Sequence, residues 1–155
     1  MVLYKTIILV LAKQNTEAVM KALSVRGDYI MDMIAGKKKI EYRTWKTNYR
    51  GPLLMCSTAK KVAGAAPGYA ICVVNLKSIQ YFPFEDLYYW NIELVDVIKP
   101  IHVKGQLKLF NVDDDLIKPI SRKEFELEVR PLIYMPKRRK KSNKKIIPNV
   151  FRIVK

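Results

Sequence analysis

The 155-residue chain has few of the side chains that build catalytic and metal centres, with two cysteines and one histidine. The lone His102 excludes a two-histidine ribonuclease mechanism, and we expect it to be structural because no second ligand or base accompanies it. The sequence also has no glycine-rich phosphate loop and no Ser/His/Asp set. We therefore expect neither a metal ion nor a cofactor.

Long apolar runs and a secretory signal are also missing. The strongest apolar run, Ile7 to Ala12, is too short to span a bilayer, and Lys13 follows it without a small-residue cleavage pattern. The cysteines, Cys56 and Cys72, lie in apolar, strand-like runs, where a free thiol behaves as a small hydrophobic group. We expect reduced thiols, a cytoplasmic location and no membrane binding, since no long basic amphipathic helix is evident.

Carboxylates are scarce relative to basic side chains. Lys and Arg number 29 against 14 Asp and Glu, which gives a formal net charge of +15. A field of this sign attracts polyanions through the release of their counterions, so nucleic acid is the first partner to consider. Half of the residues are hydrophobic, and the length is that of one domain with a real core, so the chain is globular.

The ends of the chain differ from its centre. From Lys137 onward there are nine Lys and Arg and no carboxylate. Such a run supplies affinity for phosphates without sequence choice, or serves only as a solubilising tail. We predict an N-terminal extension over residues 1–19, a single domain over 20–136 and a basic tail over 137–155. The dense part of the tail consists of Lys137, Arg138, Arg139, Lys140 and Lys141.

The hydrophobic pattern predicts a mixed domain. A short helix is expected over residues 29–35, with Asp28 at its start and Gly36 after its end. A second helix is expected after Ser121, with Glu124 in capping-box spacing. Strand patterns cover residues 39–45, 52–58, 69–82, 87–98 and 102–110. These elements predict an α+β fold built around a compact, barrel-like sheet.

One short motif carries the strongest resemblance to a known family. Gly36, Lys38, Glu41 and Arg43 form G-x-K-x-x-E-x-R after the first helix, and the segment RTWKTNYRGPLLMCST continues it. This pattern resembles the ASCH (activating signal cointegrator homology) domain family of the PUA-like superfamily. Three further blocks are similar to family segments: KALSV at 21–25, YAICVVNLKSI at 69–79, and 88–110, which contains Trp90 and the run PIHVKG.

The resemblance implies a PUA-like compact β-barrel of about five or six strands with short flanking helices, and a cleft lined by the motif. The better-studied relatives in the superfamily bind RNA. It therefore implies a nucleic-acid-binding module with RNA as its partner and single-stranded DNA as an alternative. The candidate cleft residues are Lys38, Glu41, Arg43, Trp45, Arg50, Ser57, Thr58 and Trp90.

The motif residues themselves are consistent with a cleft. Glu41 and Arg43 are two apart on a strand and share one face, while Lys38 lies at the turn before it. A carboxylate between basic groups stays ionised and orients them, and Tyr42, Trp45 or Trp90 would supply a stacking surface for a base. The alternative is an exposed ion pair of little energetic value beside aromatic side chains that belong to the core.

Two other functions remain open. One bacterial ASCH branch hydrolyses acetylated cytidine with a Lys, a Thr and a distant Glu; Lys38 matches that Lys, but Glu41 replaces the Thr and cannot act as a hydroxyl nucleophile. Glu85 and Glu93 are candidates for the distant Glu. A Lys, Glu and Arg cluster is also able in principle to perform acid–base chemistry on RNA, as a ribonuclease does. A protein-interaction module of the coactivator type is the third alternative.

Overall fold

The computed structural model describes residues 18–139. The predicted N-terminal extension, apart from its last two residues, and Lys140 and Lys141 of the predicted basic tail lie outside the described residues. Lys137, Arg138 and Arg139 are described and exposed. The elements are β1 (Val19–Val25), α2 (Gly27–Ile34), β2 (Ile40–Arg43), β3 (Gly51–Ser57), β4 (Tyr69–Phe82), β5 (Leu87–His102), β6 (Leu109–Asp113), η1 (Asp114–Leu116), α3 (Arg122–Val129) and η2 (Arg130–Leu132).

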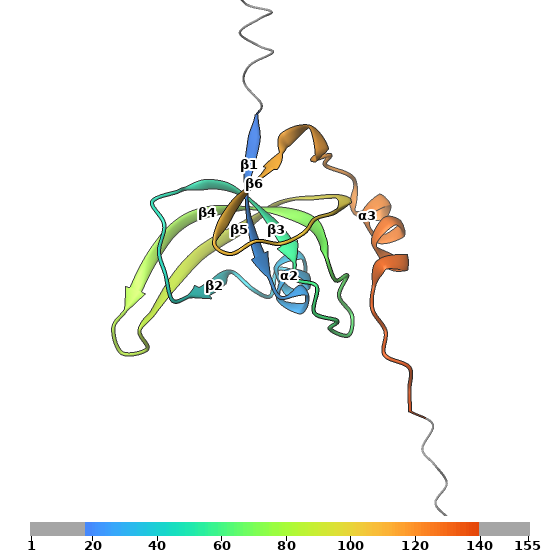
Figure 1. Cartoon of the computed structure of the whole chain (residues 1–155), viewed down its shortest axis with the longest axis horizontal. Coiled ribbons are helices and arrows are strands. Elements are labelled where there is room, and N and C mark those ends of the chain that lie inside the picture. Colours follow the sequence, from blue (N-terminus) through green and yellow to red (C-terminus); the bar gives the residue numbers. More distant parts are fainter. Residues whose placement is uncertain (1–17, 140–155) are drawn as a thin grey trace, which may run out of the picture.

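The strands form one curled mixed sheet in the order β2-β5-β4-β3-β1-β6 (Figure 1). β1 and β3 run parallel, and the other neighbouring pairs are antiparallel. β4 and β5 are long and project together as a hairpin beyond the rest of the sheet. The structure thus confirms the α+β class and a barrel-like curvature. No helix within residues 18–139 is long and apolar enough to cross a membrane.

β5 differs from the prediction of two strands over 87–98 and 102–110. It continues through Pro100 to His102, and residues 103–108 form a connection to β6. The register explains how a strand accommodates this proline. Cys72 pairs with Val97 and Ala70 pairs with Ile101, so three residues of β5 lie opposite Ile71 alone. A bulge of this kind leaves the position of Pro100 without the ladder hydrogen bond that a proline cannot donate.

α2 packs on the sheet through one apolar side. Ile30, Met33 and Ile34 are buried in the main core with Leu53 and Trp90. The helix begins at Gly27, earlier than predicted, so Asp28 does not cap it; Asp28 lies in the first turn and accepts hydrogen bonds from Arg26. Glycine is favoured at 27 because an added Cβ would lie 2.6 Å from Ser57 Oγ and 2.8 Å from Ala65 Cβ, which would force these neighbours to shift.

The two cysteines lie on opposite faces of the sheet. Cys72 belongs to the main core, and Cys56 belongs to a second apolar cluster with Phe110 and Val112. Both are free and buried, and burial raises the pKa of each thiol to about 12. The prediction that both behave as small hydrophobic side chains is confirmed.

Candidate nucleic-acid interface

A tight connection between α2 and β2 places Lys38. Gly36 follows the helix with φ of +76°, a conformation that glycine adopts without the penalty of a Cβ. The backbone N–H groups of Lys37 and Lys38 then both donate to the carbonyl oxygen of Asp32, at 2.9 and 3.2 Å. These bonds hold the backbone of the connection in one conformation, so they fix the position of Lys38 beside β2.

Glu41 lies between two cations. Its Oε2 is 3.4 Å from Lys38 Nζ, and its Oε1 is 3.1 Å from Arg43 Nη2. Glu41 is 5% exposed, and the side chains of Lys38 and Arg43 are 15% and 22% exposed. The prediction that Glu41 and Arg43 share one face of a strand is confirmed. The cluster is partly withdrawn from water, so its charges interact more strongly than those of an exposed pair.

Arg43 also joins the first strand of the sheet to the fifth. Its Nη2 donates to the backbone carbonyl of Ser24 at 2.8 Å, which links β2 to β1. β2 and β1 are separated by three strands in sheet order, so this contact exists because the sheet curls. A guanidinium has several donors in a fixed plane, which lets one side chain serve both Glu41 and this carbonyl.

Three buried polar atoms of this region have no hydrogen-bond partner within residues 18–139: Ser24 Oγ, Glu41 Oε2 and Arg43 Nε. Glu41 Oε2 has the charge of Lys38 nearby, but the geometry is not that of a hydrogen bond. Because buried polar groups in folded proteins are nearly always bonded, a concentration of unbonded ones indicates a place where a ligand or water completes the network. All three belong to residues joined by the contacts of Arg43.

Hollows adjoin the cluster on more than one side. Lys38 lines a pocket of about 470 Å³ with Asn91 and Glu93, and another of about 450 Å³ with Tyr29 and Tyr42. Ser24 lines a third pocket, of about 590 Å³, which also includes Thr58 and His102. These volumes are those of small-ligand sites.

The two tryptophans occupy structural positions. Trp90 is fully buried in the core, and its Nε1 donates to the carbonyl of Trp45 at 3.3 Å. The Trp45 ring packs edge-on against it with centroids 4.8 Å apart. Trp90 therefore has no free face for a base, which corrects the interpretation of this residue as a stacking surface. Trp45 is half-buried against the same core.

The remaining predicted residues lie in different surroundings. Arg50 donates to the carbonyls of Thr47 and Tyr49 in its own loop. Ser57 is buried beneath the start of α2, and Thr58 lies in the pocket that Ser24 lines. Within residues 18–139 no side-chain hydrogen bond or ion pair joins these three to Lys38 or Glu41. His102 is exposed and packs edge-on against Tyr69, with ring centroids 5.2 Å apart.

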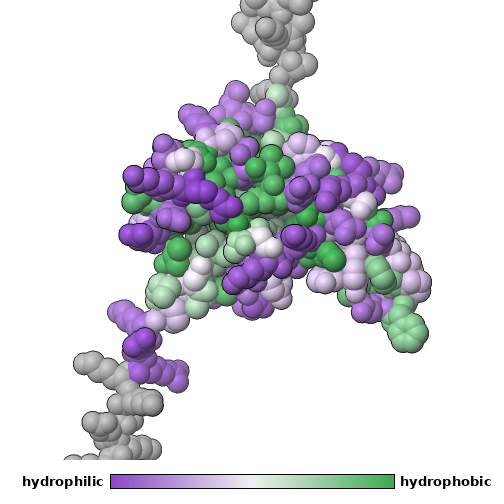
Figure 2. All heavy atoms as spheres, turned by 180° about the vertical axis from the view of Figure 1, so that it is seen from behind, coloured by the Kyte–Doolittle hydropathy of each residue, from purple (hydrophilic) through white to green (hydrophobic). Residues whose placement is uncertain are grey.

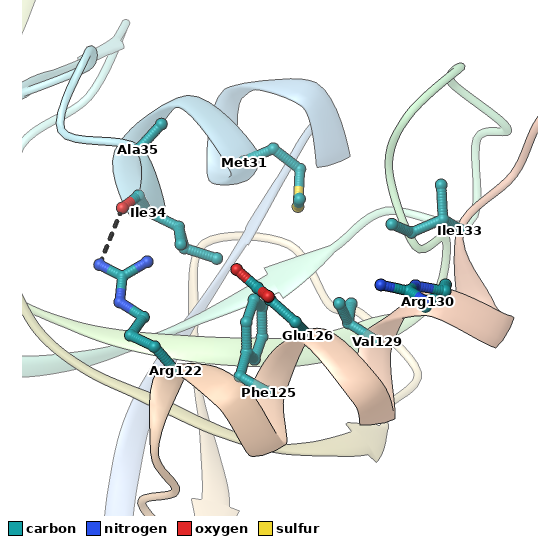
Figure 3. A pocket seen from close by; sticks show the side chains of 9 residues that line it. All are labelled: Met31, Ile34, Ala35, Arg122, Phe125, Glu126, Val129, Arg130 and Ile133. Carbon is teal, nitrogen blue, oxygen red and sulfur yellow. Dashed lines mark hydrogen bonds between the residues drawn. The ribbon is translucent and has the colours of Figure 1, made fainter.

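A separate pocket of about 320 Å³ lies between α2 and α3 (Figure 3). Its lining is largely apolar, with Met31, Phe125 and Val129 pointing into it. Arg122 borders it and donates to the carbonyl of Ile34 at 3.0 Å, which ties α3 to the end of α2. None of the motif residues lines this pocket, so it is distinct from the Lys38–Glu41–Arg43 cluster.

Two contributors to the region were missed from the sequence. Ser24 gives no local signal because its contact with Arg43 spans 19 residues. Tyr29 was expected only as the first residue of a short helix, but it is 40% exposed and its ring lies beneath Lys38 Nζ, with the centroid 4.9 Å away. No local sequence signal marked Tyr29 as a site residue, because the next lysine after it is Lys37, eight residues further along the chain.

Comparison with known families gives one match. A family model described as the ASCH domain matches residues 23–119. The matched segment begins within β1, ends before α3, and includes Lys38, Glu41, Arg43 and Ser24. A search of curated proteins finds no match.

Proposed function

The chain belongs to the ASCH domain family, whose model matches more than half of its residues, and on this premise we propose that it binds nucleic acid, with RNA as its ligand. ASCH domains are PUA-like modules, and RNA binding is general in that superfamily. A net charge of +15 supports a polyanionic ligand, because each phosphate contact releases counterions.

The observation that carries the proposal is the partly buried cluster of Lys38, Glu41 and Arg43. Its carboxylate is held by two cations, yet Glu41 Oε2 and Arg43 Nε lack hydrogen-bond partners among the described residues. The edge of a base offers both donors and acceptors, so it is able to bond to Glu41 Oε2 and Arg43 Nε together. Such bonds would also select one base over another. Lys38 and Arg43 would also attract the phosphates next to that base.

The finer architecture belongs to the same proposal. We infer a PUA-like barrel whose curled sheet is closed by side chains, with the cluster at the seam. The bond from Arg43 on β2 to Ser24 on β1 supports this arrangement, because it joins strands that are far apart in sheet order. We also retain the division into a domain over 20–136 and a basic tail over 137–155, whose role is sequence-independent affinity for phosphates.

The test is fluorescence anisotropy with a labelled, unstructured 12-nucleotide RNA titrated by the full chain at several salt concentrations. We expect salt-dependent binding that Lys38→Met weakens about tenfold, because this variant keeps the aliphatic stem and removes the charge. Lys123→Met is the matched control, since Lys123 is an exposed lysine of α3. Equal loss in both variants, or no binding by the unmodified chain, would overturn the proposal.

The hydrolase alternative has its own measurement. Lys38 and Glu93 line the same pocket, and Glu93 was a candidate for the distant carboxylate, although its partner at 3.6 Å is Lys77. Incubation of the chain with N4-acetylcytidine, followed by chromatography of the nucleoside, tests it. Turnover that Lys38→Ala abolishes would replace the binding module with an amidohydrolase.

A further inference from the structure

A row of aromatic side chains, three exposed and one half-buried, surrounds Lys38 and leads away from it. The ring of Tyr42 contacts that of Tyr89 with centroids 4.7 Å apart and an interplanar angle of 88°. Tyr89 in turn stacks on Phe82, with centroids 4.0 Å apart and planes 29° apart. On the other side, Lys38 Nζ lies 4.9 Å from the ring centroids of both Tyr42 and Tyr29. We call Tyr29, Tyr42, Tyr89 and Phe82 the aromatic row.

The sheet register explains why these rings meet on one surface. Tyr42 pairs directly with Tyr89 across β2 and β5, so their side chains point to the same face. Glu41 pairs with Trp90 and therefore points to the opposite face, toward the core. Lys38 contacts Glu41 on one side and the rings of Tyr29 and Tyr42 on the other, because it approaches from the open edge of β2. It connects the buried cluster to the aromatic row.

The row is accessible. Tyr42 is 48% exposed, and Tyr29 and Phe82 are exposed to a similar degree. In Figure 2 the β4–β5 hairpin projects at the lower right, and its tip carries pale and green side chains where much of the surrounding surface is purple. Cross-strand aromatic pairs do stabilise hairpins, but that role explains neither the position of Tyr29 on a different element nor a lysine between two rings.

Cations accompany these rings. The pocket of about 450 Å³ next to the row is lined by Tyr29, Tyr42 and three consecutive lysines at 37–39, with Asp32 as its one carboxylate. The Arg26 guanidinium lies 4.9 Å from the Tyr29 ring centroid and also pairs with Asp28. Aromatic faces interleaved with cations are the surface that binds unpaired bases and their phosphates. Lys38 lies between the rings of Tyr29 and Tyr42, and an uncharged apolar peptide would not account for a cation at that place.

We propose that the aromatic row is a stacking track for consecutive bases of a single-stranded nucleic acid that continues from the Lys38–Glu41–Arg43 cluster. This inference rests on the proposed function and adds to it a choice of single strands over duplexes. In a duplex the bases stack on each other and leave no face for a protein ring, whereas an unpaired strand offers each base to an aromatic surface.

The hydroxyl group of Tyr89 is engaged within the hairpin tip. Tyr89 donates its hydroxyl to Glu85, and this bond raises the pKa of Tyr89 to about 12, so the phenol stays neutral at physiological pH. The hydroxyl group is occupied within the tip, while the ring faces toward Tyr42 and Phe82. Stacking uses the ring, so the track does not depend on that hydroxyl group.

The experiment compares row variants with a matched aromatic residue outside the row. Anisotropy with a labelled 12-nucleotide single-stranded RNA, and with the same RNA annealed to its complement, is measured for the full chain, Tyr42→Ala, Phe82→Ala and Phe84→Ala. Phe84 is fully exposed on the same hairpin and makes none of the ring contacts of the row. Tryptophan fluorescence verifies folding, because Trp45 and Trp90 pack in or against the core.

We expect Tyr42→Ala and Phe82→Ala each to weaken single-strand binding by roughly 5- to 100-fold, the effect of one lost stacking contact. Phe84→Ala should bind the single strand as tightly as the unmodified chain, and the row variants should keep their affinity for the duplex. Tyr42→Phe should bind the single strand as tightly as the unmodified chain, because it keeps the ring. The dependence of affinity on salt should keep its slope, since no phosphate contact is removed. Lys38→Met, in contrast, should reduce that slope.

Three results would overturn the track, and the first two are separable from failure of the proposed function. If the unmodified chain binds RNA in a Lys38-dependent way but the row variants behave like Phe84→Ala, the track is wrong and the binding module stands. If anionic vesicles, and not single-stranded RNA, bind in a Phe82-dependent way, the row contacts a membrane instead. Absence of any RNA binding rejects both proposals together.

Discussion

Replacing Arg43 with alanine should destabilise the fold as well as alter binding. Arg43 makes two contacts of different kinds, one with the carboxylate of Glu41 at 3.1 Å and one with the carbonyl of Ser24 at 2.8 Å. The first balances a buried charge, and the second joins β2 to β1. Truncation removes both at once, so the effect extends beyond a single ion pair.

The magnitude follows from burial. A hydrogen bond to a charged group contributes about 1.5–3 kcal/mol. Removing one partner of a fully buried ion pair costs about 3–5 kcal/mol. The second value is an upper limit here, because Lys38 remains 3.4 Å from Glu41 and the Arg43 side chain is 22% exposed. We therefore expect a loss of about 2–4 kcal/mol in the free energy of unfolding, which corresponds to a fall in Tm of roughly 6–12 °C.

Urea unfolding followed by tryptophan fluorescence measures this loss, since Trp45 and Trp90 report on the core. Arg50→Ala is the control; Arg50 is exposed and bonds only to carbonyls of its own loop, so its loss should stay within about 0.5 kcal/mol. Arg43→Lys should lie between the two, because an ammonium group lacks the planar fork that serves both partners. An Arg43→Ala chain as stable as Arg50→Ala would refute the reasoning.

Two further predictions concern the core. Gly27→Ala should lower the free energy of unfolding by about 1–2 kcal/mol, because the new methyl group overlaps Ser57 Oγ and Ala65 Cβ. This cost outweighs the gain of up to about 1 kcal/mol in helix propensity. An unchanged urea midpoint would contradict the prediction. At pH 8 the thiols of Cys56 and Cys72 should react slowly with Ellman's reagent in the folded chain, because burial raises both pKa values to about 12 and keeps the thiols neutral. In urea both thiols should react rapidly. Fast reaction of the folded chain would show that these thiols are accessible.

Local patterns predicted much of the fold. The turn at Gly36 with positive φ, the helix capped by Ser121, whose side chain accepts from the N–H of Glu124, and the long strand over 69–82 all follow from short-range rules. The strand through Pro100 was missed because the bulge that accommodates it depends on the register with β4, which no local pattern reveals.

At the candidate site too, local patterns predicted the short-range contacts and missed the long-range ones. The ion pairs of Glu41 with Lys38 and Arg43 were predictable, since strand periodicity and a tight turn bring together residues within five positions of each other. The contact of Arg43 with Ser24 and the row from Tyr29 to Phe82 were not, because they join segments that meet only in the curled sheet. For Trp90 the family pattern placed the residue near the motif, but burial decided its role.

The central claim is that single-stranded nucleic acid binds at Lys38 and the neighbouring edge of β2. The most direct test is photocrosslinking of the full chain to RNA that contains 4-thiouridine, followed by mass spectrometry of the crosslinked peptides. The account predicts crosslinks within residues 37–43 and 81–89, lost on addition of unlabelled RNA. Crosslinks confined to residues 137–155 would contradict it, because they would place the RNA on the basic tail alone.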